Sequence, residues 1–195
     1  MSIIEFCIIF LSIYFVSILL HEVGHVIAYR AHGKKVEFCI VGTSKEFRLS
    51  FLNPEYSFKF AGTTFILTPW LFSGVTLSSD FTGLDKKELF KIAASGPVVN
   101  IFLFLSSASV LIYGYTYLIF HESIFIILIS VAALNFSLSV VNLYPIVKDN
   151  FYNDGAIIKA GKFPYDTEQL QELVLQCAAR VNNEKHKNDI SSLYK

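Results

Sequence analysis

Three long apolar segments constrain this chain more than any other feature of its sequence. The first, residues 3–29, opens with an apolar run that is broken only by Glu5, and the second and third, residues 92–120 and 124–147, contain no Asp, Glu, Lys or Arg. Each is long enough to cross a hydrocarbon core of about 30 Å as a helix that rises about 1.5 Å per residue. The sequence therefore predicts an α-helical polytopic membrane protein with three spans.

Composition agrees with a membrane protein. Hydrophobic residues make up 53% of the chain and charged residues only 16%, whereas soluble proteins contain about 25% charged residues. The net charge is zero, so nothing indicates nucleic acid as a partner. The three cysteines, Cys7, Cys39 and Cys177, are scattered, and we expect free thiols. The first segment lacks the basic start of a signal peptide, so we expect it to remain as a spanning helix.

Basic residues set the expected orientation of the spans. Arg30, Lys34 and Lys35 follow the first segment directly, and Lys148 follows the third. The short connection at residues 121–123 contains no Lys or Arg. By the positive-inside rule, the N-terminus lies outside and the C-terminal end of the first span faces the cytoplasm.

Residues 36–77 alternate between apolar and polar positions, a pattern typical of short β-strands. The alternating apolar residues are Val36, Phe38, Ile40, then Phe47, Leu49, Phe51, then Tyr56, Phe58 and Phe60. We expect a small β-strand region at the cytoplasmic face of the membrane, followed by an interfacial segment around Trp70. Two roles are open: the strands only cover the helix ends, or one edge pairs with an extended substrate segment.

The C-terminal part, residues 166–195, has the pattern of an amphipathic helix. Its apolar face is formed by Leu170, Leu173, Val174, Cys177 and Val181. The polar end, residues 182–195, is expected to fray. Two parts are thus expected: a membrane core at residues 1–165 and a cytoplasmic helix with its tail at residues 166–195.

The first span ends in the motif His-Glu-Val-Gly-His at residues 21–25. His21 and His25 are four residues apart and lie on one helical face, so both imidazoles can bind one Zn²⁺ while Glu22 activates water. The alternative is a pair of interfacial histidines that reach toward lipid headgroups. Ionisable groups inside a membrane are costly and usually mark function, which favours the metal site.

A zinc hydrolase site needs a third protein ligand. Glu5 and Glu122 are expected at the outer face, far from the histidines, which leaves Asp149 and Asp154. Pro145 ends the third helix and makes the following chain irregular. This loop can bring Asp154 back toward the histidines.

Two asparagines lie at the depth of the motif. Counted at about 1.5 Å per residue from the outer end of its own segment, each of Asn100 and Asn142 reaches about the level of His21. One interpretation is interhelical hydrogen bonding. The other is that one or both hold the substrate backbone or a developing oxyanion.

An ordered set of motifs resembles the site-2 protease family of intramembrane zinc metalloproteases. The motifs are His21-Glu22-Val23-Gly24-His25, Ala94-Ser95-Gly96-Pro97-Val98-Val99-Asn100, Asn142-Leu143-Tyr144-Pro145 and Asp154-Gly155. The resemblance implies a three-span metalloprotease core. It also implies an enzyme that cleaves transmembrane or membrane-anchored protein substrates in or near their spans, with a zinc-bound water as the nucleophile.

The resemblance also implies the roles of individual residues. His21, His25 and Asp154 bind one zinc ion, Glu22 is the general base, and two residues help to place the substrate, namely Asn100 and Asn142. The family often places Asp-Gly only a few residues after the proline, whereas this interval is longer and contains Asp149. Asp154 is favoured as the third ligand because Gly155 and an apolar continuation follow it, and Asp149 is the alternative.

Two other classes of protein compete with this interpretation. The first is a catalytically inactive relative that binds a partner helix as a regulatory or immunity protein. The second is the membrane endopeptidase type that processes prenylated proteins and takes its third ligand from a glutamate on a later helix. The second and third segments contain no glutamate, which disfavours that type. The substrate, any upstream protease and the oligomeric state are not indicated by the sequence.

Overall fold

A computed structural model describes the chain in eight stretches, residues 2–42, 56–68, 74–78, 80, 84–117, 120–148, 151–162 and 167–192. Three features expected from the sequence lie outside these residues: the strand at 47–51, the interfacial segment around Trp70, and Asp149.

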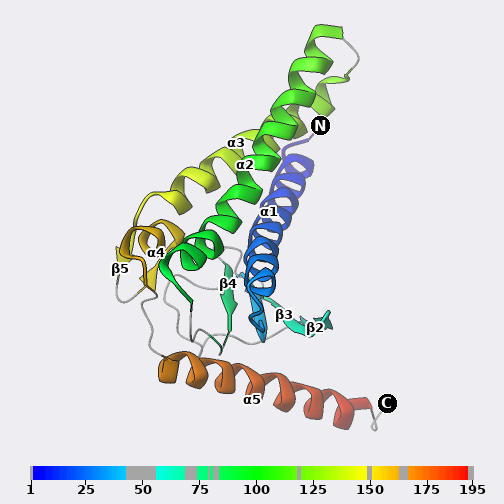
Figure 1. The fold of residues 1–195 in the computed structure, drawn as a ribbon. Helices are drawn as coiled ribbons and strands as arrows, with labels where there is room; N and C mark the ends of the chain where they lie inside the picture. The colour runs from blue at the N-terminus through cyan, green and yellow to red at the C-terminus, as the bar shows by residue number, and fades with distance from the viewer. Residues whose placement is uncertain are drawn as a thin grey trace.

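Three long helices form the body of the molecule (Figure 1): α1 (Ile3–Ala31), α2 (Lys86–Tyr117) and α3 (Glu122–Leu143). All three are long and apolar enough to cross a membrane. Many of their large apolar side chains are exposed along their length, as expected for helices that face lipid. The three apolar segments of the sequence are thus helices that pack side by side.

The helix bounds differ from the expected spans for local reasons. Helix α2 begins at Lys86 rather than at 92, because the Glu88 amide donates to Asp85 Oδ1 (2.8 Å) and the Asp85 amide donates to Glu88 Oε2 (2.9 Å). This reciprocal capping box satisfies two amides at the helix start. Helix α3 ends at Leu143 rather than at 147, because Pro145 cannot continue the helix.

A four-stranded sheet lies at one end of the helices. It contains β1 (Phe38–Val41), β2 (Tyr56–Phe60), β3 (Thr63–Leu67) and β4 (Gly74–Leu77) in the order β2-β3-β1-β4. β1 pairs parallel to β3 with Phe38 opposite Thr64, and antiparallel to β4 with Phe38 opposite Leu77. The expected strand region is therefore present, and β4 forms one edge of the sheet that the described residues make.

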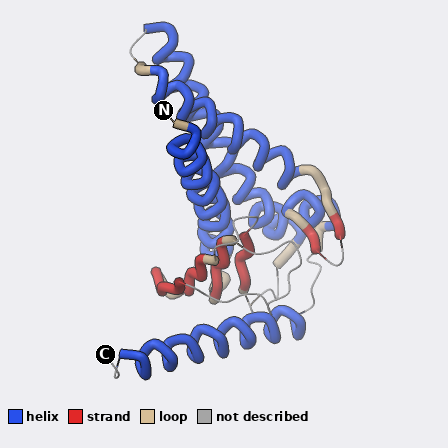
Figure 2. The backbone as a smooth tube through the Cα atoms, turned by 180° about the vertical axis from the view of Figure 1, so that it is seen from behind, coloured by secondary structure: helices blue, strands red, loops and turns tan. Residues whose placement is uncertain are grey.

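The two faces of the sheet pack against different helices. Cys39, Val41 and Phe65 belong to a buried cluster with residues of α1. Phe38, Ile40 and Leu77 point to the other face, where they pack against α5 (Thr167–Ser192). Figure 2 shows α5 running crosswise beneath the strands, away from the three long helices.

Four of the five apolar residues expected on one face of the C-terminal helix lie on the side of α5 that meets the sheet, and the fifth, Leu170, is also buried. Cys177 is buried, and Leu173, Val174, Ala178 and Val181 pack against the same cluster. In the structure α5 continues to Ser192, beyond residue 182, where the chain is expected to fray. The three cysteines are free thiols, as expected, and Cys39 and Cys177 are buried.

Two small elements follow α3. The strands β5 (Val147–Lys148) and β6 (Phe151–Tyr152) pair antiparallel, and the short helix α4 (Asp154–Ala160) comes next. Helix α4 packs against both α2 and α3. This arrangement brings the chain back toward the cytoplasmic end predicted for α1.

Candidate active site

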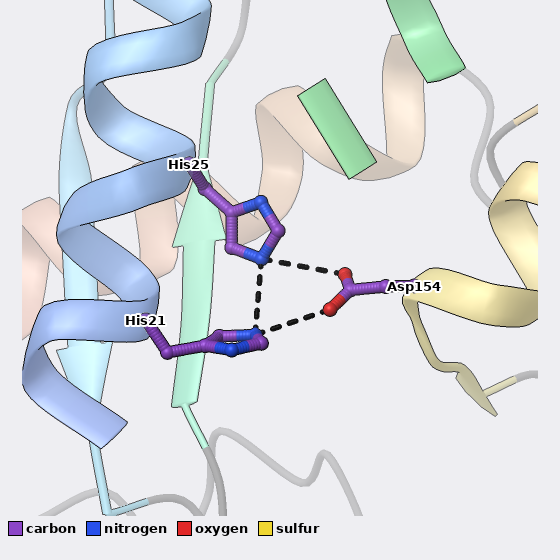
Figure 3. Close-up of side chains that lie close together, drawn as sticks. All are labelled: His21, His25 and Asp154. Carbon is purple, nitrogen blue, oxygen red and sulfur yellow. Dashed lines mark hydrogen bonds and ion pairs between the residues drawn. The ribbon is translucent and has the colours of Figure 1, made fainter. Parts of the chain in front are cut away.

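Three candidate metal ligands meet where α1 and α4 approach each other. His21 and His25 point from α1 toward the Asp154 carboxylate at the start of α4 (Figure 3). His21 Nε2 lies 3.1 Å from Asp154 Oδ2, His25 Nε2 lies 3.3 Å from Oδ1, and the two Nε2 atoms are 3.2 Å apart. One ligand atom from each residue lies within 4.8 Å of the others, a group that could hold one metal ion.

The two histidines of this cluster are buried. The two histidines are only 6% and 7% exposed, so their polar atoms have little access to solvent. Burial by itself raises the pKa of the Asp154 carboxyl, but the neighbouring His25 and His21 outweigh it and hold that pKa well below its ordinary range. The lowered pKa favours the ionised carboxylate, which is the form that binds a metal.

The outer nitrogens of both rings have partners of their own. His25 Nδ1 donates to the carbonyl oxygen of Ile92 (2.8 Å), and Ser95 Oγ lies 3.2 Å from the same nitrogen. With its proton on Nδ1, the ring directs the Nε2 lone pair toward the cluster. Metal-binding histidines are usually held in this way by a second hydrogen bond.

Asn100 occupies the equivalent place behind His21. Its Nδ2 lies 3.1 Å from His21 Nδ1, and its side chain is fully buried. Asn100 Oδ1 has no hydrogen-bond partner among the described residues. A half-turn of the carboxamide brings Oδ1 to His21 Nδ1–H, which frees Nε2 as a ligand. Asn100 thus contacts the histidine directly.

The space between the two imidazoles fits a metal ion. A Cβ atom built on Gly96 would lie 2.4 Å from His25 Nε2 and 2.5 Å from His21 Nε2. Helix α2 therefore presents bare backbone to the two ligand atoms. Two imidazoles and one carboxylate form a ligand set typical of catalytic zinc, so the residues present fit zinc.

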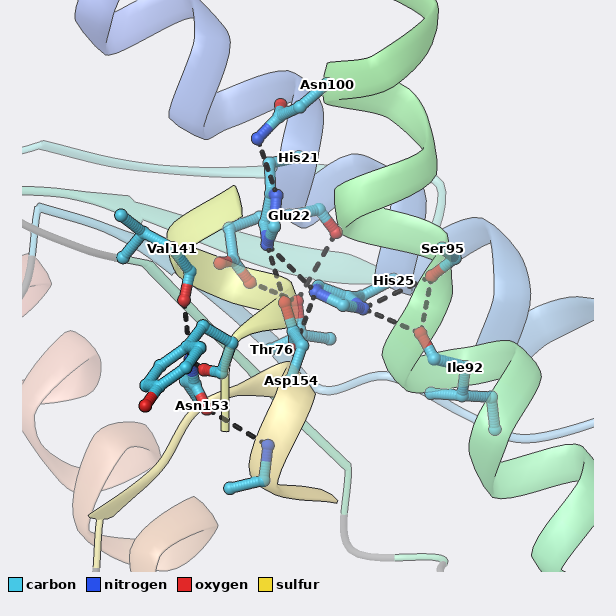
Figure 4. A network of polar contacts seen from close by, with 12 residues as sticks. His21, Glu22, His25, Thr76, Ile92, Ser95, Asn100, Val141, Asn153 and Asp154 are labelled. Carbon is cyan, nitrogen blue, oxygen red and sulfur yellow. Dashed lines mark hydrogen bonds and ion pairs between the residues drawn. The ribbon is translucent and has the colours of Figure 1, made fainter. Parts of the chain in front are cut away.

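Glu22 is held by the edge strand of the sheet. Thr76 Oγ1 on β4 donates to Glu22 Oε2 (2.8 Å), as Figure 4 shows. A Cβ atom on Gly74, two residues earlier on the same strand, would lie 2.4 Å from Glu22 Cγ. Glu22 is only 4% exposed. The strand thus leaves room for the carboxylate and fixes one of its oxygens.

A cavity of about 440 Å³ adjoins the histidines and Glu22. Its walls come from α1, α2, α3, α4, β4 and β6, and they include Tyr14, Thr76, Leu138 and Asn142. The lining is mostly apolar, and it also includes the polar side chains of His21, His25 and Asp154. Such a cavity can hold an apolar peptide segment beside a polar reaction centre.

The structure brings most of the expected site residues together. His21, His25 and Asp154 form the candidate metal group, Glu22 and Asn142 line the adjoining cavity, and Asn100 lies directly behind His21.

Sequence reasoning did not identify Thr76 or the steric role of Gly96. Gly96 lies in the motif Ala94-Ser95-Gly96-Pro97-Val98-Val99-Asn100. Nothing near Thr76 in the sequence indicates a contact with Glu22, which is 54 residues away.

A buried histidine pair with an intervening glutamate and a distant carboxylate defines the class of zinc-dependent metalloproteases with the His-Glu-x-x-His motif. This chain belongs to Peptidase family M50, whose sequence model matches residues 9–125, more than half of the chain. The resemblance to the site-2 protease family is thereby confirmed. A comparison with curated proteins finds no match.

Membership defines the general class of the protein. Family M50 consists of zinc-dependent membrane metalloproteases, and the three apolar helices agree with a membrane protein. The matched range ends at residue 125, so Asp154 lies beyond it. The case for Asp154 therefore depends on its position beside the two histidines.

Proposed function

We propose that this chain is an intramembrane zinc metalloendopeptidase that hydrolyses peptide bonds in or near the spans of membrane-protein substrates. The observation that carries this proposal is the approach of the Asp154 carboxylate to within 3.1 and 3.3 Å of the two Nε2 atoms of the motif. Family membership supports the reaction class.

His21, His25 and Asp154 would hold the zinc ion. When bound, zinc would act as a Lewis acid that lowers the pKa of water and polarises a peptide carbonyl. Glu22 accepts the proton of the attacking water and then donates it to the amine of the departing peptide. Thr76 keeps the Glu22 carboxylate in one orientation during both transfers, because its hydroxyl donates to Oε2.

The substrate must offer an unwound segment, because the carbonyls of an intact helix are already hydrogen-bonded within it. The cavity beside Asp154 is bordered by Gly74, Val75 and Thr76 of the edge strand β4. An extended segment that pairs with this edge would pass next to Glu22. Asn142, which lines the same cavity, can hold its backbone.

The orientation follows from the basic residues after α1. By the positive-inside rule, Arg30, Lys34 and Lys35 favour the cytoplasmic side for this end of the helix. The proposed protease then has its N-terminus outside, its sheet and α5 in the cytoplasm, and its active site near the inner leaflet.

The direct test compares wild type with Glu22→Gln. Glutamine keeps the size of the side chain but cannot accept the proton, so cleavage should fall by at least about a hundredfold. Zinc content, measured on purified protein by atomic emission, should stay near one per chain. Quantitative proteomics of membranes from cells that express each form measures the loss of full-length membrane proteins.

Glu122→Gln serves as the matched control because Glu122 is exposed at the opposite end of α3. It should cleave like wild type. If wild type and Glu22→Gln produce the same membrane fragments, the chain is not a protease, and an inactive binding protein becomes the better description. If neither form retains zinc, the metal assignment is wrong.

A further inference from the structure

The chain between Pro145 and Asp154 has to solve a geometric problem. Helix α3 ends at Leu143, the strands β5 and β6 then carry the chain out and back, and Asp154 must still reach the histidines on α1. The helix α4 that begins with Asp154 has only seven residues. Helices of this length are not stable by themselves, so the position of Asp154 depends on contacts made by the residues around it.

Asn153 makes those contacts. Its Nδ2 donates to the carbonyl oxygens of Val141 (2.9 Å) and Tyr144 (2.7 Å) at the end of α3. Its Oδ1 accepts from the amides of Ile146 (2.9 Å) and Ala156 (3.0 Å). The carboxamide therefore uses both of its donor hydrogens and both lone pairs of its acceptor.

These four bonds join two helix ends. Carbonyl groups at the end of a helix and amides at the start of the next lack partners within their own helices. Asn153 satisfies members of both sets and is itself only 8% exposed. Figure 4 shows its side chain next to Val141, with Asp154 directly after it at the start of α4.

Gly155 shows how closely the two helix ends approach. A Cβ atom at this position would lie 2.3 Å from the carbonyl oxygen of Leu143. The backbone of α4 thus contacts the last turn of α3 directly. Any loosening of this contact would move the Asp154 carboxylate away from the two Nε2 atoms.

We infer that Asn153 is a positioning residue for the metal centre: it clamps the start of α4 to the end of α3 and so sets the Asp154 carboxylate at the histidine pair. This inference rests on the proposed function. A simple helix cap would need only the bond from the Ala156 amide, whereas the clamp also needs the two bonds to the carbonyls of α3.

The experiment measures zinc affinity in the Glu22→Gln background, by competition with a fluorescent chelator in detergent. Asn153→Ala should weaken zinc binding by about 10- to 100-fold, the range for residues that orient metal ligands. Asn153→Ser should remain at least about tenfold weaker. Serine caps a helix as well as asparagine does, but it has no amide to reach the α3 carbonyls.

Asn182→Ala is the matched control, because Asn182 carries an exposed amide on α5. This variant should bind zinc like the parent. The apparent Tm is measured in excess chelator, so that bound zinc does not contribute to it, and it should be similar for the parent and Asn153→Ser. Should Asn153→Ala not yield folded protein, Asn153→Ser decides the question.

Zinc affinity of Asn153→Ser within about threefold of the parent would overturn the clamp, because a cap alone would then suffice. A loss of affinity that only follows a lower Tm would overturn it as well. If the parent protein itself binds no zinc, the proposed function fails, and this inference fails with it.

Discussion

At the scale of single residues, Gly96 decides whether the two imidazoles can face a common ion. A methyl group there would lie within 2.5 Å of both Nε2 atoms, a distance at which something must move. We expect Gly96→Ala to weaken zinc binding by more than about tenfold, as measured by chelator competition on purified protein.

Val98→Ala is the control for this change, because Val98 lies two residues further along α2 and is 57% exposed. It should bind zinc normally. If Gly96→Ala retains the zinc affinity of the parent, the metal ion does not bind in the space beside Gly96.

At the scale of elements, strand β4 links the sheet to the proposed general base. Thr76→Val keeps the shape of the side chain but removes the donor to Glu22 Oε2. A hydrogen bond to a charged group contributes about 1.5–3 kcal/mol, so kcat should fall by about tenfold or more. The measurement is cleavage of a reporter substrate in detergent, with zinc content determined in parallel.

Thr76→Ser provides the conservative comparison, since it keeps the hydroxyl. It should restore most of the activity lost in Thr76→Val, and both variants should hold zinc. Equal activity of Thr76→Val and the parent would show that the strand does not orient Glu22.

At the scale of the whole molecule, the sheet, α4 and α5 all lie at the end of the helices that carries the candidate active site (Figure 1). By the positive-inside rule, the basic residues after α1 predict that this end lies in the cytoplasm. In a variant without native cysteines, Glu122→Cys should react with a membrane-impermeant maleimide on intact cells. Gln171→Cys, exposed on α5, should react only after the cells are opened.

The opposite labelling pattern would show that the topology is reversed and that the proposed active site lies at the outer leaflet. Labelling of both positions in intact cells would show that the three long helices do not all cross the membrane. In the proposed topology, Glu122 at the start of α3 and helix α5 lie on opposite sides of the membrane.

The sequence by itself determined the elements that depend on neighbouring residues. Apolar runs of sufficient length predicted the three long helices, and the spacing of His21 and His25 placed two ligands on one face of α1. The proline at 145 predicted the end of α3, because it lacks an amide hydrogen. These signals are local, so no knowledge of the tertiary fold was needed to read them.

Only the tertiary structure decided which distant groups meet these elements. Asp154 lies 133 residues from His21, and its approach depends on Asn153 and on the close contact at Gly155. The partners of Glu22 and of the two outer ring nitrogens come from β4 and α2. Contacts across such separations are fixed by the packing of helices and strands, which leaves no periodic trace in the sequence.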